Sequence, residues 1–176
     1  MAFPISPTNG QIYKNYKYNS TTGSWTIPNG SKLVNSSVLT KTTQSSANST
    51  TSYFDISGLS VLYTPKKIGN VIVVRGIFSA GIALNTAGLN HAGVTIRTLI
   101  NTTPGTDNTF WYRDDDTNAP KEVQTTLNSI LYYTTTNTNA ITIKGQISTV
   151  LSGGAATMGI NIWGGTSYIE IQEFEG

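Results

Sequence analysis

The densest group of chemistry-bearing side chains is a run of three carboxylates, Asp114-Asp115-Asp116, with Arg113 directly before it and Asp107 nearby. Closely spaced carboxylate oxygens can bind Ca²⁺. However, consecutive aspartates in a loop point in different directions, and the twelve-residue calcium loop with its glycine and terminal glutamate is absent. We therefore interpret the run as a solvated loop and expect no metal site.

A second chemistry is the hydrolysis of glycans, which needs two carboxylates facing each other across a cleft. The remaining candidates are Asp55, Glu122, Glu170 and Glu173. Their spacing selects no pair, and the alternation around Glu170 places it on the polar face of a strand. The carboxylates therefore do not predict a hydrolase.

Histidine and cysteine chemistry is restricted, because the chain has no cysteine and a single histidine, His91. This excludes a disulfide framework, a thiolate zinc site, a cysteine nucleophile and any site with two histidine ligands. His91 lies in the loop-like segment 89–93, so we expect it at the polar surface; a pH-sensitive contact at a subunit axis is the alternative. We predict that the protein is not an enzyme and carries no cofactor.

Aromatic side chains are the better candidates for binding. They occur as Phe110-Trp111-Tyr112, as Tyr132-Tyr133 and as Trp163. Such side chains stack on sugar rings or fill a subunit interface, because one end is apolar and the other wet. Core packing is the alternative, since Trp163 follows the alternating Met158, Ile160 and Ile162 and could cover one face of a sheet. No sequence signature is specific for sugar binding.

The composition indicates a surface of hydroxyl and amide groups. Charged residues make up only 11% of the chain, whereas threonine, serine and asparagine account for 61 of its 176 residues. A formal net charge of +2 is far from the clustered basic excess of a nucleic-acid-binding surface, so we expect no nucleic-acid partner. Residues 1–7 lack a secretory signal pattern and no run approaches the length of a membrane span, so we expect a soluble protein made in the cytoplasm.

The patterning predicts an all-β fold. Helical periodicity is almost missing, and runs rich in β-branched and aromatic residues are separated by clusters of Gly, Pro, Asn and Asp. The runs are 53–57, 60–64, 71–79, 93–101, 109–113, 122–134, 139–148, 156–163 and 167–174. Short strands at this spacing indicate an antiparallel β-sandwich or jelly roll.

Alternation within these runs predicts which side chains face the core. Ile141 and Ile143 share one face of their strand, and Ile169 and Ile171 share one face of the last strand. Residues 71–78 are different, because they are apolar on both faces until Arg75. This pattern fits a central strand that is covered on both sides, or one whose second face meets another subunit.

We predict three parts along the chain: an N-terminal arm (1–26), a polar connector (27–50) and a β-sandwich head domain (51–176). Prolines hold the arm extended, and its aromatic side chains offer a large contact area for docking to a partner. The predicted docking residues are Phe3, Pro4, Pro7, Tyr13, Tyr16, Tyr18 and Trp25. The alternative is a small hairpin with its own minor core and turns at Gly10 and Gly23.

The opening of the chain resembles a module of tailed-bacteriophage virion proteins. The resemblance rests on Phe3-Pro4-Ile-Ser6-Pro7-Thr-Asn9-Gly10-Gln11-Ile-Tyr13, followed by Tyr16-Lys-Tyr18-Asn and Gly23-Ser-Trp25. The pattern Phe-Pro-x-Ser-Pro-x-x-Gly-x-x-Tyr, then Tyr-x-(Asn/Asp) and Gly-x-Trp, covers about 25 residues. It implies that the arm anchors the protein to the major capsid protein or to another virion protein.

The remainder resembles virion-associated β-sandwich modules of marine and cyanobacterial phages. Ser52-Tyr-Phe-Asp-Ile-Ser-Gly58 through Thr64-Pro65-Lys-Lys is similar to their opening strand pair, and Tyr168-Ile-Glu-Ile-Gln-Glu-Phe to their terminal strand. Their usual Ser-Ser-Lys is here Ile68-Gly69-Asn70. The resemblance implies a homotrimer with a jelly-roll head like that of tumour necrosis factor.

The expected function is therefore that of a non-enzymatic virion structural protein, a trimeric capsid decoration or cement protein. The alternative is a tail-fibre or tail-tip protein that binds host surface glycan, and a polysaccharide depolymerase comes third. The aromatic residues Trp111, Tyr112, Tyr132, Tyr133 and Trp163 are the candidates for glycan or subunit contacts.

Overall fold

The computed structural model describes residues 6–9, 12–13, 16–21, 23–26, 32–47, 50–84, 90–114, 121–153 and 155–176, and its regular elements are all β-strands. None of these residues forms a helix long and apolar enough to cross a membrane. The strands are β1 (Ile12–Tyr13), β2 (Tyr16–Asn19), β3 (Ser24–Thr26), β4 (Leu33–Lys41), β5 (Ser45–Ala47), β6 (Thr50–Tyr63), β7 (Val71–Leu84), β8 (Asn90–Ile100), β9 (Thr103–Pro104), β10 (Asn108–Asp114), β11 (Lys121–Thr134), β12 (Ile141–Ser152), β13 (Ala156–Ile160) and β14 (Ser167–Phe174).

The long strands pair as though one long hairpin had been rolled up. β4 pairs with β14, β6 with β12, β7 with β11 and β8 with β10, all antiparallel. One sheet has the order β10-β8-β12-β6, with β9 beside β8; the other has β4-β14-β7-β11, with β13 continuing β14 along β7 and β5 beside β13. This is the strand order of a jelly roll. The predicted all-β antiparallel sandwich is therefore confirmed.

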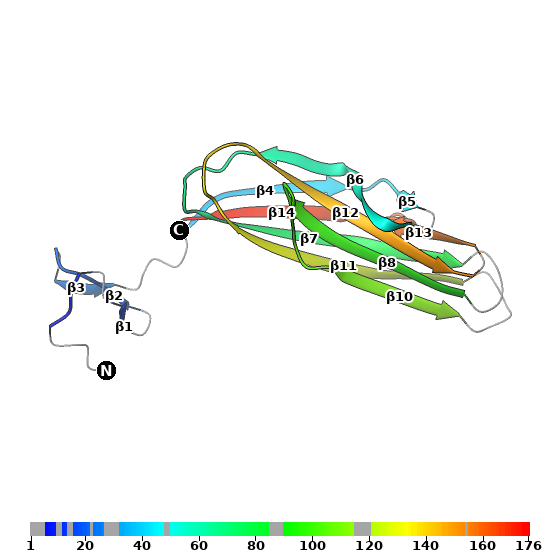
Figure 1. The fold of residues 1–176 in the computed structure, drawn as a ribbon, viewed down its shortest axis with the longest axis horizontal. Helices are drawn as coiled ribbons and strands as arrows, with labels where there is room; N and C mark the ends of the chain where they lie inside the picture. Colours follow the sequence, from blue (N-terminus) through cyan, green and yellow to red (C-terminus); the bar gives the residue numbers. More distant parts are fainter. Residues whose placement is uncertain are drawn as a thin grey trace.

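Figure 1 shows the two sheets as an elongated sandwich, with the C-terminus at the end of the sandwich nearer to β1–β3. Side chains that point inward from both sheets form one core, mostly of Ile, Val, Leu and Ala. Phe78 of β7 is its largest fully buried side chain. Gly76 of β7 and Gly145 of β12 both border this ring; a Cβ at Gly145 would lie 3.0 Å from Phe78 Cε1. The two glycines therefore leave the space that the ring fills.

The predicted connector is wrong for residues 33–47, because β4 and β5 belong to the six-stranded sheet. β4 pairs along the whole of β14, from Leu33 opposite Phe174 to Lys41 opposite Ser167. As an edge strand, β4 exposes most of its serine, asparagine and threonine side chains, and Leu39 packs against the core. A hydrated edge strand needs few apolar residues, which is why its sequence looks like a linker.

The structure also corrects the strand boundaries expected between residues 53 and 64 and the loop position expected for His91. Runs 53–57 and 60–64 form a single strand, β6, in which residues 56–59 lie opposite Gly145 and Gly58 has a φ of +83°. A glycine with positive φ marks a bulge here rather than a turn. His91 lies in β8, half-buried, and not in a loop.

The N-terminal segment forms a small antiparallel sheet, β1-β2-β3. Tyr13 lies opposite Tyr16, Tyr18 lies opposite Trp25, and Gly23 has a φ of +61° in the turn between β2 and β3. Strands β1, β2 and β3 thus form the small sheet that the hairpin alternative anticipates. Phe3, Pro4 and Gly10 lie outside the described residues.

We predict that Gly76→Ala lowers the free energy of unfolding by about 1–3 kcal/mol, because the added methyl overpacks the core. Its Cβ would lie 2.7 Å from both Phe78 Cζ and Thr98 Cγ2. In Phe78→Leu the smaller side chain makes room, so the double variant should lose less stability than the sum of the two single variants. Urea unfolding measures all three.

The control is Thr126→Ala at an exposed position of β11, which should change the free energy of unfolding by no more than about 0.5 kcal/mol. Strict additivity of Gly76→Ala and Phe78→Leu would show that the ring and the glycine are not packed together.

Candidate functional site

The outer face of the six-stranded sheet is apolar where β7 crosses it. Val71, Val73 and Ile77 alternate with fully buried side chains of β7 but remain partly exposed. The register places Phe174 of β14 opposite Val71 and Tyr132 of β11 opposite Val73. The side chains of Val71, Val73, Tyr132 and Phe174 line a cavity of about 300 Å³. We call these four residues the β7 outer patch.

Polar groups border this patch further along β7. Arg75 lies opposite Glu170 of β14, and its Nη1 is 3.3 Å from Glu170 Oε2. Glu170 Oε1 also accepts a hydrogen bond from Gln172 Nε2 at 2.9 Å. Because this pair is largely exposed, it contributes little to stability on its own. Its position next to an apolar patch is typical of the rim of an interface.

The structure separates the aromatic candidates into three groups. Phe110, Tyr112 and Tyr133 pack against the core, as the core alternative anticipates. Trp163 packs on Gly81 of β7, where a Cβ would lie 2.6 Å from its Cζ3 atom. Trp111 and Tyr132 are 59% and 65% exposed. They lie on the outer faces of different sheets, so they cannot belong to one site.

The outer face of the five-stranded sheet is polar and held by a chain of side-chain contacts. Asp55 of β6 accepts hydrogen bonds from Lys144 Nζ at 2.6 Å and from Gln146 Nε2 at 2.7 Å. Gln146 Oε1 accepts a bond from Arg97 Nε at 2.9 Å. The bonds from Lys144 and Gln146 lower the pKa of Asp55 below its usual value. The carboxylate is therefore charged and fixed at neutral pH.

Tyr53 extends this chain at its Arg97 end. The guanidinium carbon of Arg97 lies 3.6 Å from the centre of the Tyr53 ring, a cation–π contact. Burial and a hydrogen bond with Asp107 raise the pKa of Tyr53. The arginine is thus held from two sides, by Gln146 and by Tyr53.

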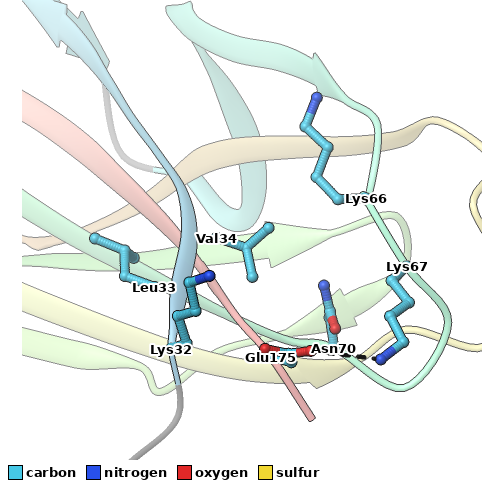
Figure 2. Close-up of a pocket in the computed structure, with 7 residues that line it drawn as sticks. All are labelled: Lys32, Leu33, Val34, Lys66, Lys67, Asn70 and Glu175. Carbon is cyan, nitrogen blue, oxygen red and sulfur yellow. Dashed lines mark ion pairs between the residues drawn. The ribbon is translucent and has the colours of Figure 1, made fainter.

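A cleft of about 350 Å³ lies at the end of the sandwich that carries the C-terminus. It is lined by Lys32, Leu33, Val34, Lys66, Lys67, Asn70 and Glu175. Lys67 Nζ lies 3.7 Å from Glu175 Oε1. Figure 2 shows this pair at one side of the cleft, while the Lys66 side chain points away from it. The charged groups therefore do not converge on one point, as a catalytic site would require.

Beneath this cleft lies Glu173, a fully buried carboxylate. Its Oε2 accepts a bond from the Tyr63 hydroxyl at 2.7 Å, and its Oε1 accepts bonds from Asn70 Nδ2 at 2.7 Å and the Lys66 amide at 2.8 Å. Burial alone would raise the pKa of Glu173, but these bonds outweigh burial and lower it. Burial and the bond to Glu173 raise the pKa of Tyr63 to about 12. The carboxylate thus ties the β6–β7 loop to β14.

Sequence reasoning missed this buried role of Glu173, although a signal was present. Glu173 has the same parity as Ile169 and Ile171, which face the core, so strict alternation predicts that it points inward. Of the other carboxylate candidates, Asp55 and Glu170 are held by the partners described above, and Glu122 is exposed on β11. The arrangement fits structural bonding better than acid–base chemistry.

Of the run Asp114-Asp115-Asp116, the structure describes only the backbone of Asp114. Asp114 ends β10, but its side chain, Asp115 and Asp116 lie outside the described residues. Elsewhere in the described part of the chain, no three His, Asp or Glu side chains are close enough to hold a metal ion together. The side chains of Tyr13, Tyr16 and Trp25 are likewise outside the described set, whereas Tyr18 and Pro7 are half-buried.

No protein-family model and no curated protein matches this sequence. Among solved structures, that of infectious bursal disease virus Gt strain aligns with a TM-score of 0.36 and 14% identity, covering 99% of this chain and 47% of the other. The VP2 subviral particle of the same virus gives a TM-score of 0.35 and 14% identity, with coverage of 98% and 47%. This chain spans just under half the length of those chains. Likenesses this low assign no role to it.

We predict that Glu173→Gln lowers the free energy of unfolding at pH 7 by about 1–3 kcal/mol, because an amide cannot satisfy all of the surrounding donors. The pH dependence follows from the lowered pKa. As pH falls, the Glu173 carboxylate is protonated near pH 4.5 in the unfolded chain and at a lower pH in the folded chain. The stability that Glu173 contributes is therefore present above about pH 4.5 and is lost as pH falls further. The gap between wild type and variant should therefore narrow below about pH 4.5.

Urea unfolding at a series of pH values measures this gap. The control is Glu175→Gln, which removes an exposed ion pair in the same region and should cost less than about 1 kcal/mol. Equal losses in the two variants would contradict the role of Glu173 as a buried tie.

Proposed function

We propose that this chain is a non-enzymatic structural protein of a bacteriophage virion, a homotrimer that decorates the capsid surface. The N-terminal module would anchor it, and the jelly-roll head would form the displayed part. Support comes from the N-terminal sequence resemblance, from a β-sandwich head, and from one apolar sheet face. The apolar face of the six-stranded sheet is the observation that carries the proposal.

The β7 outer patch is centred on β7, a strand in the middle of its sheet with both edges paired. Apolar side chains on a central strand gain stability when their outer face is covered, roughly 25 cal/mol for each Å² removed from water. The strands β4, β14, β7 and β11 lie side by side along residues 71–77 of β7, and Trp163 covers Gly81 further along. Four strands about 4.8 Å apart over these seven residues give a face of roughly 19 by 23 Å. This is about half of the ~800 Å² that each partner contributes to a standard interface, so neighbouring surface would have to add to the contact.

A second copy of the same chain is the simplest cover. The face combines an apolar patch with the polar rim formed by Arg75 and Glu170, the composition expected where copies of one protein meet. A closed ring of copies buries every such face and leaves none exposed for open-ended association. Three copies are the expectation from the resemblance to trimeric phage modules.

We predict that the protein is a trimer by light scattering and that Tyr132→Lys shifts it to the monomer, because a lysine placed in the patch would be buried without a partner. The matched control is Leu62→Lys, which changes a side chain of similar exposure (72%) on the other sheet. This variant should remain a trimer.

A wild-type protein that is monomeric at micromolar concentration would contradict the proposed assembly. A mass that falls equally in both variants would place the interface elsewhere. Circular dichroism melts show whether each variant is folded before its mass is interpreted.

We predict that a chain lacking residues 1–26 folds but no longer loads onto virions. The sandwich begins at β4, so its strands survive the deletion, while the aromatic docking residues are lost. Replacing Tyr13, Tyr16 and Trp25 together by alanine should reproduce the loss. Quantitative protein analysis of purified particles, with thermal melts of the isolated proteins, measures both effects.

The same measurement counts copies per particle. Hundreds of copies fit capsid decoration, whereas a handful would favour the tail-fibre alternative. Normal loading of the truncated chain would assign attachment to the sandwich instead of the N-terminal module.

A further inference from the structure

Trp111 lies flat on the outer face of the five-stranded sheet. It is opposite Gly93 in the register of β10 and β8, and a Cβ at Gly93 would lie 2.8 Å from Trp111 Cε3 and 2.9 Å from Cζ3. The indole therefore rests on bare backbone, where any other residue would lift it. Because Trp111 is 59% exposed, much of its surface faces solvent as a rigid platform.

Polar groups continue from this platform along β8. The next outward pair is Thr95 and Thr109, whose hydroxyl oxygens are 2.9 Å apart. Beyond them lies Arg97, held by Gln146 and by Tyr53. From Gly93 to Arg97 the strand rises about 13 Å. Along the strand, the row therefore presents the indole ring of Trp111, then the hydroxyl groups of Thr95 and Thr109, then the guanidinium of Arg97.

We propose that this row, Trp111 with Thr95, Thr109, Arg97 and Gln146, binds an oligosaccharide. The C–H face of a pyranose ring would stack on Trp111, and its hydroxyl groups would exchange hydrogen bonds with the threonines and with the Arg97–Gln146–Asp55 chain. The row is long enough to contact more than one sugar ring. Because Asp55 holds Gln146 and Gln146 holds Arg97, little side-chain entropy remains to be lost on binding.

The chemistry of the face favours a sugar over other occupants. A protein partner needs an apolar centre, but the outward pairs on both sides of Trp111 along β8 and β10 are polar, Thr95–Thr109 and His91–Arg113. A nucleic acid needs several unopposed cations, but in this row Lys144 is paired with Asp55 at 2.6 Å and the guanidinium of Arg97 lies over the Tyr53 ring. Neutral pyranoses need one flat aromatic group with several hydroxyl and amide partners, which is what this face provides. The site is separate from the β7 outer patch, so the inference does not depend on trimer formation.

The test is a titration of the ¹⁵N-labelled full chain, followed by NMR, with oligosaccharides of glucose, galactose, rhamnose and N-acetylglucosamine. The indole N–H signal of Trp111 is assigned from the Trp111→Phe variant. We expect at least one of these sugars, at millimolar concentration, to shift this signal together with the amides of Thr95 and Arg97. Trp111→Ala should weaken binding about tenfold or more.

Gly93→Ala provides a second variant, which retains the indole but prevents it from lying flat; it should weaken binding of the same sugar. Leu62→Ala removes an exposed aliphatic side chain from the same sheet face and should leave binding unchanged. Thermal melts establish that each variant is folded. If none of the four sugars shifts the Trp111 signal, or if a sugar binds Trp111→Ala as well as wild type, the proposal is overturned.

Discussion

The constraint on which the structure depends is that β7 is apolar on both faces. Its inward side chains, among them the fully buried Phe78, form much of the core. Its edges pair with β11 on one side and with β14 and β13 on the other, so the six-stranded sheet is built around it. Its outward side chains remain partly exposed within one chain. The strand that stabilises the sandwich through its inward side chains therefore also carries the apolar outer face on which the proposed trimer depends.

The sandwich presents different chemistry in different directions. The six-stranded sheet carries the β7 outer patch, which we propose is covered by copies of the chain. The five-stranded sheet carries Trp111 on a polar surface, where we propose that a hydroxyl-rich ligand binds. At the end near the C-terminus, the buried carboxylate of Glu173 holds the β6–β7 loop by accepting three hydrogen bonds, from the Tyr63 hydroxyl, the Asn70 side-chain amide and the Lys66 backbone amide.

Alternation predicted much of this fold, because a side chain's face follows from its parity. It placed Ile141, Ile143, Ile169 and Ile171 in the core, where they are buried. It failed for β4, since a hydrated edge strand has too few apolar residues to show a pattern. The pairing of Trp111 with Gly93 could not be predicted, because it depends on the register of two strands and not on either sequence alone.

The most direct test is the rate of alkylation of a thiol introduced in the β7 outer patch, which is informative because the natural chain has no cysteine. In Val73→Cys, iodoacetamide should react slowly at high protein concentration, where copies cover the patch, and faster on dilution. Leu62→Cys on the other sheet should react at the same rate throughout. A Val73→Cys thiol whose reaction rate does not depend on protein concentration, in a range where light scattering detects assembly and dissociation, would contradict burial of this face between copies.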